Sequence, residues 1–206
     1  MPRTASRFGD GSPEVAKLML ALLIALRGTI LIYQGEELGL PQASLRRDQL
    51  RDPVGDLYWP YAGDRDGCRT PMPWRPDQPN LGFSEGEPWL PAAPEHAELT
   101  VAAQDADPDS TLTLARQLIA LRKDSAAMSL GDLEMLEASG STLAFVRRAG
   151  GEALACVFNM SGEPAVFEHP ALAEADILPT GAGDAEMRGG SLGLSPYAAA
   201  FLQLPL

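Results

Sequence analysis

Two adjacent acidic residues, Glu36 and Glu37, follow a short apolar run in this chain of 206 residues. Ligands of open α/β sheets and of barrels bind at the carboxyl ends of the parallel strands. If residues 29–33 form such a strand, Gln34 and both glutamates lie near an active-site face. Neighbouring carboxylates on an extended chain point to opposite sides, so these two are poorly placed to act as a catalytic pair. The alternative is that they brace loops through hydrogen bonds and ion pairs.

A second candidate site lies in residues 64–74 (DRDGCRTPMPW), where two arginines, acidic residues and a tryptophan occur together. Guanidinium groups hold carboxylates and hydroxyls in a fixed geometry. Tryptophan faces stack on the apolar side of sugar rings, but they also fill cores. Arg65 and Arg69 are therefore candidate ligand-binding residues. Taken alone, the segment is read more simply as a loop that Arg–Asp pairs hold over Trp74.

Two further patterns fail as sites. Residues 189–193 (GGSLG) match the nucleophile motif G-x-S-x-G, but neither a histidine nor an acidic residue follows them, which favours a turn between strands. Residues 64–67 (DRDG) resemble the middle of a calcium loop. Its first and twelfth ligand positions would be Ala62 and Pro73, so the loop lacks its essential acids and an EF-hand is excluded.

The remaining polar residues indicate no cofactor or metal. Asp105, Asp107 and Asp109 are explained by the start of a helix. His96 and His169 each stand alone and are expected to form hydrogen bonds rather than to catalyse. We therefore expect neither a metal nor a cofactor.

Composition narrows the partners and the location. There are 16 basic and 28 acidic residues, for a net charge of −12, so the chain would repel a nucleic acid. The two cysteines form no zinc or disulfide pattern. The apolar run 18–26 is too short for the ~20 residues that a bilayer needs. Acidic residues and Arg27 argue against a signal peptide, so we expect a cytoplasmic protein without a membrane partner.

Local patterns place the elements in two groups. Residues 13–26 predict a helix that ends near Gly28, and residues 29–33 predict a buried strand of a parallel sheet. No long periodic segment occurs over residues 34–106 apart from a possible short helix at 43–50, and a second helix is expected over 107–123. This first group reads as α/β.

Strand-like runs dominate the rest of the chain. Residues 142–148 and 152–159 flank a hairpin signal at 149–151. Shorter runs follow at residues 164–168, 176–178 and 198–204. We therefore expect an α/β part followed by a small antiparallel all-β domain, with the boundary near residues 128–131.

Several segments together resemble the α-glucosidase and oligo-1,6-glucosidase branch of glycoside hydrolase family 13. The main ones are residues 28–39 (GTILIYQGEELG), 51–53 (RDP) and 65–74 (RDGCRTPMPW), in that order. Similar segments continue at 82–84, 88–91, 107–110 and 118–122. The chain departs from the pattern at Ile30, where many members carry proline.

The resemblance implies a particular part of that fold. Such enzymes have a (β/α)8 barrel followed by an antiparallel β domain, and this chain resembles a C-terminal fragment of the barrel (residues 1–129) with the β-sandwich domain (residues 130–206). Length agrees, because a barrel alone takes about 250 residues. Residues 2–9 are similar to the segment after the family's Asn-His-Asp motif, so the catalytic carboxyl groups are expected upstream of Met1. No catalytic residue is then expected in this chain, and the chain alone is expected to be inactive.

The resemblance also implies roles for individual residues. Arg65 matches the arginine that pairs with an aspartate of the first barrel strands and clamps the terminal glucose, with Arg69 as the alternative. Arg3 and Arg7 are expected at the rim of the site. Glu36 and Glu37 match structural acids.

The implied activity is retaining hydrolysis of terminal α-linked glucose from oligosaccharides. A transglucosylase is the alternative within the family, and a non-catalytic sugar-binding or interaction module is the alternative outside it. The oligomeric state stays open.

Overall fold

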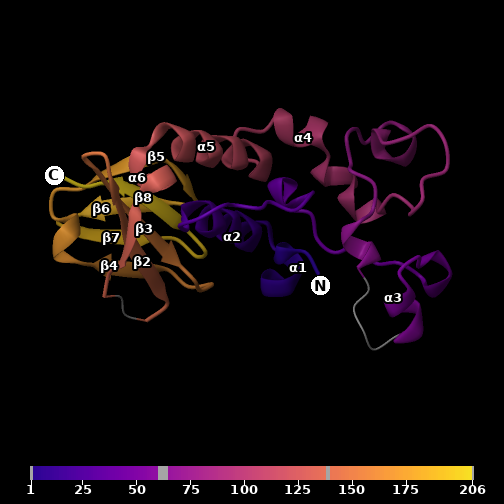
Figure 1. The fold of residues 1–206 in the computed structure, drawn as a ribbon, viewed down its shortest axis with the longest axis horizontal. Coiled ribbons are helices and arrows are strands. Elements are labelled where there is room, and N and C mark those ends of the chain that lie inside the picture. Colours follow the sequence, from indigo (N-terminus) through magenta and orange to yellow (C-terminus); the bar gives the residue numbers. More distant parts are fainter. Residues whose placement is uncertain (1, 60–64, 138–139, 206) are drawn as a thin grey trace. The chain divides into compact units, whose positions relative to one another are not determined.

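The computed structural model describes residues 2–59, 65–137 and 140–205. It contains two compact units, Met1–Ala16 with Ile32–Thr113 and Lys17–Leu31 with Leu114–Leu206 (Figure 1). Both units thus combine segments that lie far apart in the sequence, and the domain boundary expected near residue 130 remains a prediction. The calcium-loop-like segment begins at residue 62, which lies outside the described residues.

The first unit is built from short helical turns joined by loops. Its α-helices are α1 (Thr4–Gly9), α3 (Pro53–Leu57), α4 (Val101–Asp105) and the first turns of α2 (Pro13–Ala25) and α5 (Thr111–Asp124). Its 3-10 turns are η1 (Glu36–Leu38), η2 (Arg47–Gln49), η3 (Asp66–Cys68), η4 (Pro79–Gly82) and η5 (Pro94–Leu99). The helix expected at 43–50 is therefore only the single turn η2.

A small apolar cluster and one buried amide connect several segments of this unit. Leu38, Leu40 and Leu112 are buried against one another. The Gln104 side chain donates to the Leu38 carbonyl at 2.8 Å and accepts the Leu112 N–H at 3.0 Å. One side chain thus ties three segments, and it satisfies backbone groups that would otherwise be buried unpaired.

The strand expected over residues 29–33 is wrong. These residues form no strand in the structure, and Leu31 is 83% exposed. An extended segment becomes a strand only when a neighbour completes its ladder of hydrogen bonds. No other segment within the described part of the chain pairs with residues 29–33. These residues therefore form no strand, although their composition is apolar and β-branched.

The second unit is an antiparallel β structure with additional helical segments. The helices are the later turns of α2 and α5, and α6 (Ala126–Leu130). The strands are β1 (Asp132–Met135), β2 (Thr142–Ala149), β3 (Glu152–Asn159), β4 (Ala165–Glu168), β5 (Asp176–Ala182), β6 (Ala185–Arg188), β7 (Ser191–Leu194) and β8 (Ala199–Gln203), with the turn η6 (Pro170–Leu172). They form sheets of order β1-β2-β3-β8-β5 and β4-β7-β6 (Figure 1).

Both faces of the larger sheet are buried around β3. Small and aliphatic side chains of β2, β3, β7 and β8 pack with Phe167 of β4 in one apolar core. The alternate residues Phe145, Phe158 and Phe201 lie on the opposite face, with ring centroids 5.6 and 6.2 Å apart. Burial on both faces explains why β3 reads as a continuous apolar run.

Glycine pairs form two of the hairpins. Gly150 and Gly151 join β2 to β3 with φ of 61° and 77°, and Gly189 and Gly190 join β6 to β7 with φ of 58° and 88°. Positive φ at both central residues is the twist that a two-residue hairpin needs. The hairpin expected at 149–151 is confirmed. Within the G-x-S-x-G segment, Gly189 and Gly190 form the turn between strands that was expected, and residues 191–193 begin β7.

Two arginines cover the carboxyl end of α2 within the second unit. Arg122 of α5 donates to the carbonyls of Ile24, Leu26 and Gly28 at 2.6–2.8 Å. Arg147 of β2 donates to the Ala25 carbonyl at 2.6 Å. The last carbonyls of a helix have no partner within it, and they carry partial negative charge, so guanidinium groups suit them in both respects.

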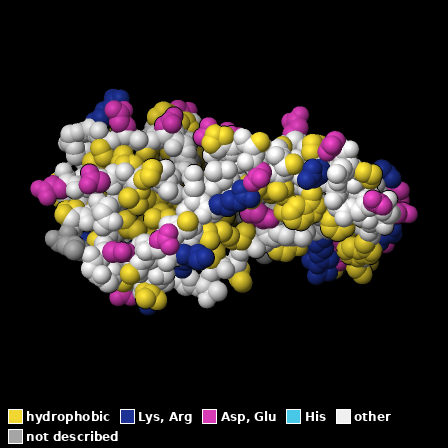
Figure 2. Space-filling model, turned by 90° about the horizontal axis from the view of Figure 1, so that it is seen from above, with side chains coloured by type: hydrophobic (Ala, Val, Ile, Leu, Met, Phe, Trp, Pro, Cys, Tyr) yellow, Lys and Arg dark blue, Asp and Glu magenta, His cyan; other side chains and the backbone are white. Residues whose placement is uncertain are grey.

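No helix among the described residues is long and apolar enough to cross a bilayer. On the face that Figure 2 displays, some acidic side chains lie beside basic ones and others stand apart from them.

Candidate functional site

The turn η3 presents the two candidate arginines. It begins after Arg65, and the Arg69 N–H donates to the Asp66 carbonyl at 2.8 Å to close it. Gly67 packs so closely that an added Cβ would lie 2.5 Å from the Ala43 carbonyl oxygen. The turn therefore requires glycine at this position, because no side chain fits between the two segments.

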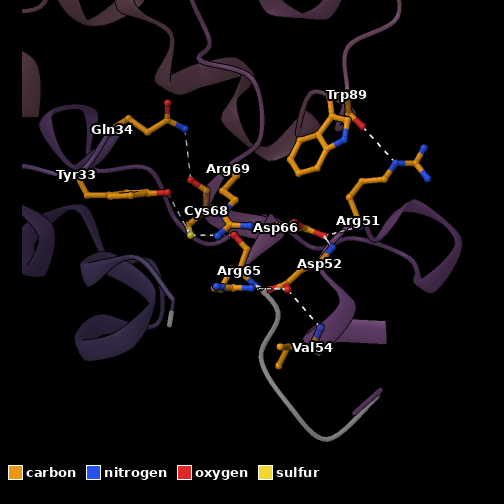
Figure 3. A network of polar contacts seen from close by, with 10 residues as sticks. All are labelled: Tyr33, Gln34, Arg51, Asp52, Val54, Arg65, Asp66, Cys68, Arg69 and Trp89. Atoms are coloured by element: carbon orange, nitrogen blue, oxygen red, sulfur yellow. Dashed lines mark hydrogen bonds and ion pairs between the residues drawn. The ribbon is translucent and has the colours of Figure 1, made fainter. Parts of the chain in front are cut away.

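Arg65 forms a two-pronged ion pair with Asp52. The Arg65 Nε and Nη2 atoms each lie 2.7 Å from an Asp52 carboxylate oxygen, and the Arg65 N–H donates at 3.2 Å (Figure 3). Asp52 also caps α3 by accepting the Val54 N–H. The Arg65 side chain is 52% exposed and that of Asp52 is 0% exposed. Hydrogen bonds from Arg65 hold the pKa of the Asp52 carboxyl well below its usual range.

The pairing of Arg65 with an aspartate of the first barrel strands, which the resemblance implied, stays a prediction. Within the described residues the Arg65 guanidinium pairs with Asp52 of the same loop. The physical reason is that a buried carboxylate needs a cation and hydrogen-bond donors nearby, and Arg65 supplies both.

Asp66 is the second buried carboxylate of this loop. Its Oδ2 atom accepts the N–H groups of Arg51 and Asp52, both at 2.6 Å. Its Oδ1 atom accepts no hydrogen bond from the described residues and lies 3.8 Å from Arg69 Nη1 (Figure 3). Asp66 and Asp52 thus connect residues 51–54 with residues 65–69, since each carboxylate belongs to one segment and accepts hydrogen bonds from the other.

Arg3 is a buried residue of the N-terminal segment that forms hydrogen bonds with the loop containing η3. It is 3% exposed, and its guanidinium donates at 3.0–3.3 Å to the carbonyls of Gln34, Pro41, Gly67 and Cys68. Burial lowers the pKa of Arg3. Arg3 was expected at the rim of the site; it lines the pocket, but its nitrogens serve the backbone.

Glu36 and Glu37 accept hydrogen bonds from their own surroundings. Glu36 accepts the Thr4 hydroxyl and the Tyr33 N–H, and Glu37 accepts the Gly35 N–H at 2.8 Å. These contacts brace the turn η1 and its approach. The structural role implied for both residues stays a prediction.

A pocket of about 360 Å³ opens between these segments of the first unit. The lining residues are Pro2, Arg3, Thr4, Arg7, Phe8, Tyr33, Glu36, Arg65, Cys68 and Arg69. The Arg7 guanidinium lies 5.0 Å from the centre of the Phe8 ring. Burial raises the pKa of the Tyr33 hydroxyl, and a hydrogen bond from Arg69 opposes that rise.

This lining is suited to binding a polar ring. Guanidinium and phenol groups form hydrogen bonds with hydroxyls, and an aromatic face packs on apolar C–H groups. Both Arg65 and Arg69 lie in the wall, so the structure brings the two alternative residues into one pocket.

Other polar residues singled out in the sequence lie away from this wall. The buried His96 donates from Nε2 to the Pro41 carbonyl oxygen at 3.0 Å, and His169 Nδ1 accepts the Ala171 N–H. Ser110, rather than an aspartate, accepts the Thr113 N–H at the start of α5. No group of three metal-binding side chains occurs within the residues that the structure describes.

Sequence reasoning missed Asp52, Asp66 and Tyr33. Asp52 carried one usable signal, because Asp before Pro typically caps a helix. Asp66 lay inside the noted motif, but nothing in the sequence distinguishes a buried acid from an exposed one. Tyr33 had been assigned to a strand.

A family model described as "Alpha amylase, catalytic domain" matches residues 1–131. The probable α-glucosidase of Rhizobium meliloti (strain 1021) is 46% identical over 171 residues, which cover 82% of this chain and 31% of that protein. The probable oligo-1,6-glucosidase 2 of Bacillus subtilis (strain 168) is 34% identical over 191 residues, with 82% and 34% covered. The chain therefore spans about a third of the length of these curated relatives.

Solved structures resemble nearly the whole chain. The α-glucosyl transfer enzyme XgtA superposes with a TM-score of 0.91 at 37% identity, covering 99% of this chain and 38% of that one. The trehalulose synthase MutB from Pseudomonas mesoacidophila MX-45 gives a TM-score of 0.83 at 29% identity, covering 98% and 41%. These neighbours are (β/α)8 enzymes, so the expected fold class, part of such a barrel with a β domain, is confirmed. The chain belongs to the α-amylase family, glycoside hydrolase family 13.

Proposed function

We propose that this chain is the C-terminal part of an α-glucosidase that removes terminal α-linked glucose from oligosaccharides. The arginine-bearing pocket of the first unit then contributes to the site for the terminal glucose. The observation that carries this proposal is the joint placement of Arg65, Arg69 and Tyr33 in one pocket of a chain from this family. The 46% identity to a probable α-glucosidase supports the substrate class.

In this proposal the catalytic carboxylates belong to the part of the enzyme that this chain does not include. Retaining hydrolysis needs two carboxyl groups about 5–5.5 Å apart. Among the described residues that line the pocket, Glu36 is the single carboxylate, and its two oxygens accept hydrogen bonds from Thr4 and Tyr33. The pocket therefore provides binding groups, and the division at residues 1–129 and 130–206 separates them from the β domain.

A chimera tests this proposal. The 206 residues would replace the matching segment of the Rhizobium meliloti relative, so that the relative supplies everything upstream. We expect the chimera to hydrolyse p-nitrophenyl α-glucoside and the 206-residue chain alone to show no activity above background. Activity of the isolated chain that disappears in Glu36→Gln or Glu37→Gln, with the fold intact, would refute the proposal.

Transglucosylation is the second candidate. It is favoured by the similarity to a solved α-glucosyl transfer enzyme, and it needs the same binding groups with a sugar or alcohol in place of water. The ratio of transfer products to free glucose made by the chimera from maltose distinguishes the two. If the chimera is inactive but the isolated chain binds glucose, the protein is instead a sugar-binding module. The proposal also includes a cytoplasmic location. The partner it names is an α-glucosidic oligosaccharide rather than a nucleic acid or a membrane.

A further inference from the structure

The turn η3 and the residue after it place an acidic side chain and a basic side chain, Asp66 and Arg69, on the same side. A 3-10 helix has three residues per turn, so side chains three positions apart lie directly above one another. Asp66 and Arg69 are related in this way, and Arg69 Nη1 lies 3.8 Å from Asp66 Oδ1. This distance is within reach of an ion pair but longer than a hydrogen bond.

The two oxygens of Asp66 face different environments. Oδ2 is engaged by two short hydrogen bonds from the backbone of residues 51 and 52. Oδ1 is buried, accepts no hydrogen bond from the described residues, and has Arg69 as its neighbouring cation. An anionic oxygen that is shielded from water attracts a nearby guanidinium more strongly than an exposed one would.

Arg69 has a second neighbour on its pocket side. Its positive charge acts to lower the pKa of the Tyr33 hydroxyl, and both residues line the same pocket. Its side chain is 35% exposed, whereas that of Asp66 is 0% exposed. Arg69 thus lines the pocket while its guanidinium lies near the buried carboxylate of Asp66 (Figure 3).

We propose that Asp66 is a positioning residue that holds the Arg69 guanidinium toward the sugar. This inference deepens the proposed function and rests on it for the identity of the ligand. Without the charge of Asp66, Arg69 would sample more rotamers and would lose entropy when it binds a hydroxyl group. Asp66 itself does not touch the sugar, because the pocket wall lies between them.

Asp66→Asn tests the proposal because asparagine keeps the shape and one acceptor oxygen. That oxygen can still accept the two backbone N–H groups, while the amide NH₂ replaces the anionic oxygen that faces Arg69. Asp56→Asn is the matched control, since Asp56 pairs with Arg47 at 2.9 Å on an exposed surface of the same unit.

The first measurement uses the 206-residue chain and needs no activity. Nitrogen-15 exchange NMR follows rotation of each arginine guanidinium about its Nε–Cζ bond. We expect Arg69 to rotate more slowly than the exposed Arg75, and Asp66→Asn to speed it about tenfold, as loss of one ion pair implies. Asp56→Asn should leave Arg69 unchanged. An unchanged Arg69 in Asp66→Asn overturns the proposal. If that variant does not fold, Arg69 rotating as fast as Arg75 in the wild-type chain overturns it.

The second measurement uses the chimera with p-nitrophenyl α-glucoside. We expect Asp66→Asn to raise KM about tenfold with kcat changed less than about threefold, because a binding group becomes disordered. The double variant Asp66→Asn/Arg69→Ala should match Arg69→Ala within about twofold, because Asp66 acts through Arg69. Additive losses overturn the proposal. An inactive wild-type chimera refutes the proposed function instead, and the NMR result then decides the role of Asp66 by itself.

Discussion

Replacing Arg147 with methionine should selectively destabilise the second unit. Arg147 is 0% exposed, and its guanidinium donates to the carbonyls of Ala25, Gly131 and Asp132 at 2.6, 2.9 and 3.3 Å. Methionine retains much of the apolar stem but leaves these acceptors unpaired. The first two contacts are buried, and an orphaned buried acceptor costs about 1–3 kcal/mol. The expected loss is therefore about 2–6 kcal/mol in the free energy of unfolding.

The neighbouring arginine provides a matched control. Arg148 points to the other side of β2, is 50% exposed and lies 3.8 Å from the exposed Glu134. Arg148→Met should change stability by less than about 0.5 kcal/mol, as is usual for surface positions.

The two units can be followed separately in one experiment. All three tryptophans belong to the first unit, so their fluorescence reports its unfolding in urea, while hydrogen exchange of peptides from β2, β3 and β8 reports the second. For a loss of ~4 kcal/mol and a urea m-value of ~2 kcal/mol/M, the midpoint of the second unit should fall by about 2 M. Equal midpoints for Arg147→Met and Arg148→Met would show that these hydrogen bonds do not hold α2 against the sheet.

Further predictions concern the first unit. In the chimera, Arg65→Ala should lower kcat/KM about a hundredfold or more and Arg69→Ala less; the reverse order would assign the clamp to Arg69. The pKa of the Asp52 carboxyl is lowered in the folded state. Its contribution to the free energy of unfolding is therefore complete above its unfolded pKa of about 3.9 and is lost as the pH falls toward its folded pKa. Stability monitored by tryptophan fluorescence should drop below about pH 4, and it should drop less steeply in Asp52→Asn. Gly67→Ala should destabilise this unit by about 1–3 kcal/mol in urea unfolding, because its Cβ would lie 2.5 Å from the Ala43 oxygen.

Local signals predicted the elements that depend on local physics. The helix expected at 13–26 is observed as Pro13–Ala25, and its Ser12 hydroxyl accepts the Val15 N–H as a capping residue does. The β2–β3 hairpin follows from two glycines between apolar runs. By contrast, residues 29–33 have the composition of a strand but no partner, and β-structure is decided by the partner.

The burial of charged residues was harder to predict from the sequence than the helices and hairpins. Arg147 looked like one of two charged residues at the end of a strand, Arg147 and Arg148. Only the packing of α2 under β2 reveals that one of them must be buried to satisfy helix carbonyls. Asp52 and Arg65 stand 13 positions apart, and no periodic pattern joins residues across a loop of that length.

Hydrogen bonds from charged side chains fix the segments around the candidate pocket. Leu38, Leu40 and Leu112 form one buried apolar cluster among the described residues of the same unit. Asp52, Asp66 and Arg3 add hydrogen bonds of 2.6–3.3 Å to backbone groups of the segments that carry the pocket residues. Hydrogen bonds are directional and apolar contacts are not, so this arrangement specifies where Arg65 and Arg69 point more narrowly than a core could. The same arrangement makes the pocket geometry sensitive to the loss of a single carboxylate charge. Asp66→Asn and low pH are therefore the informative perturbations for this unit, whereas Arg147→Met is the informative one for the second unit.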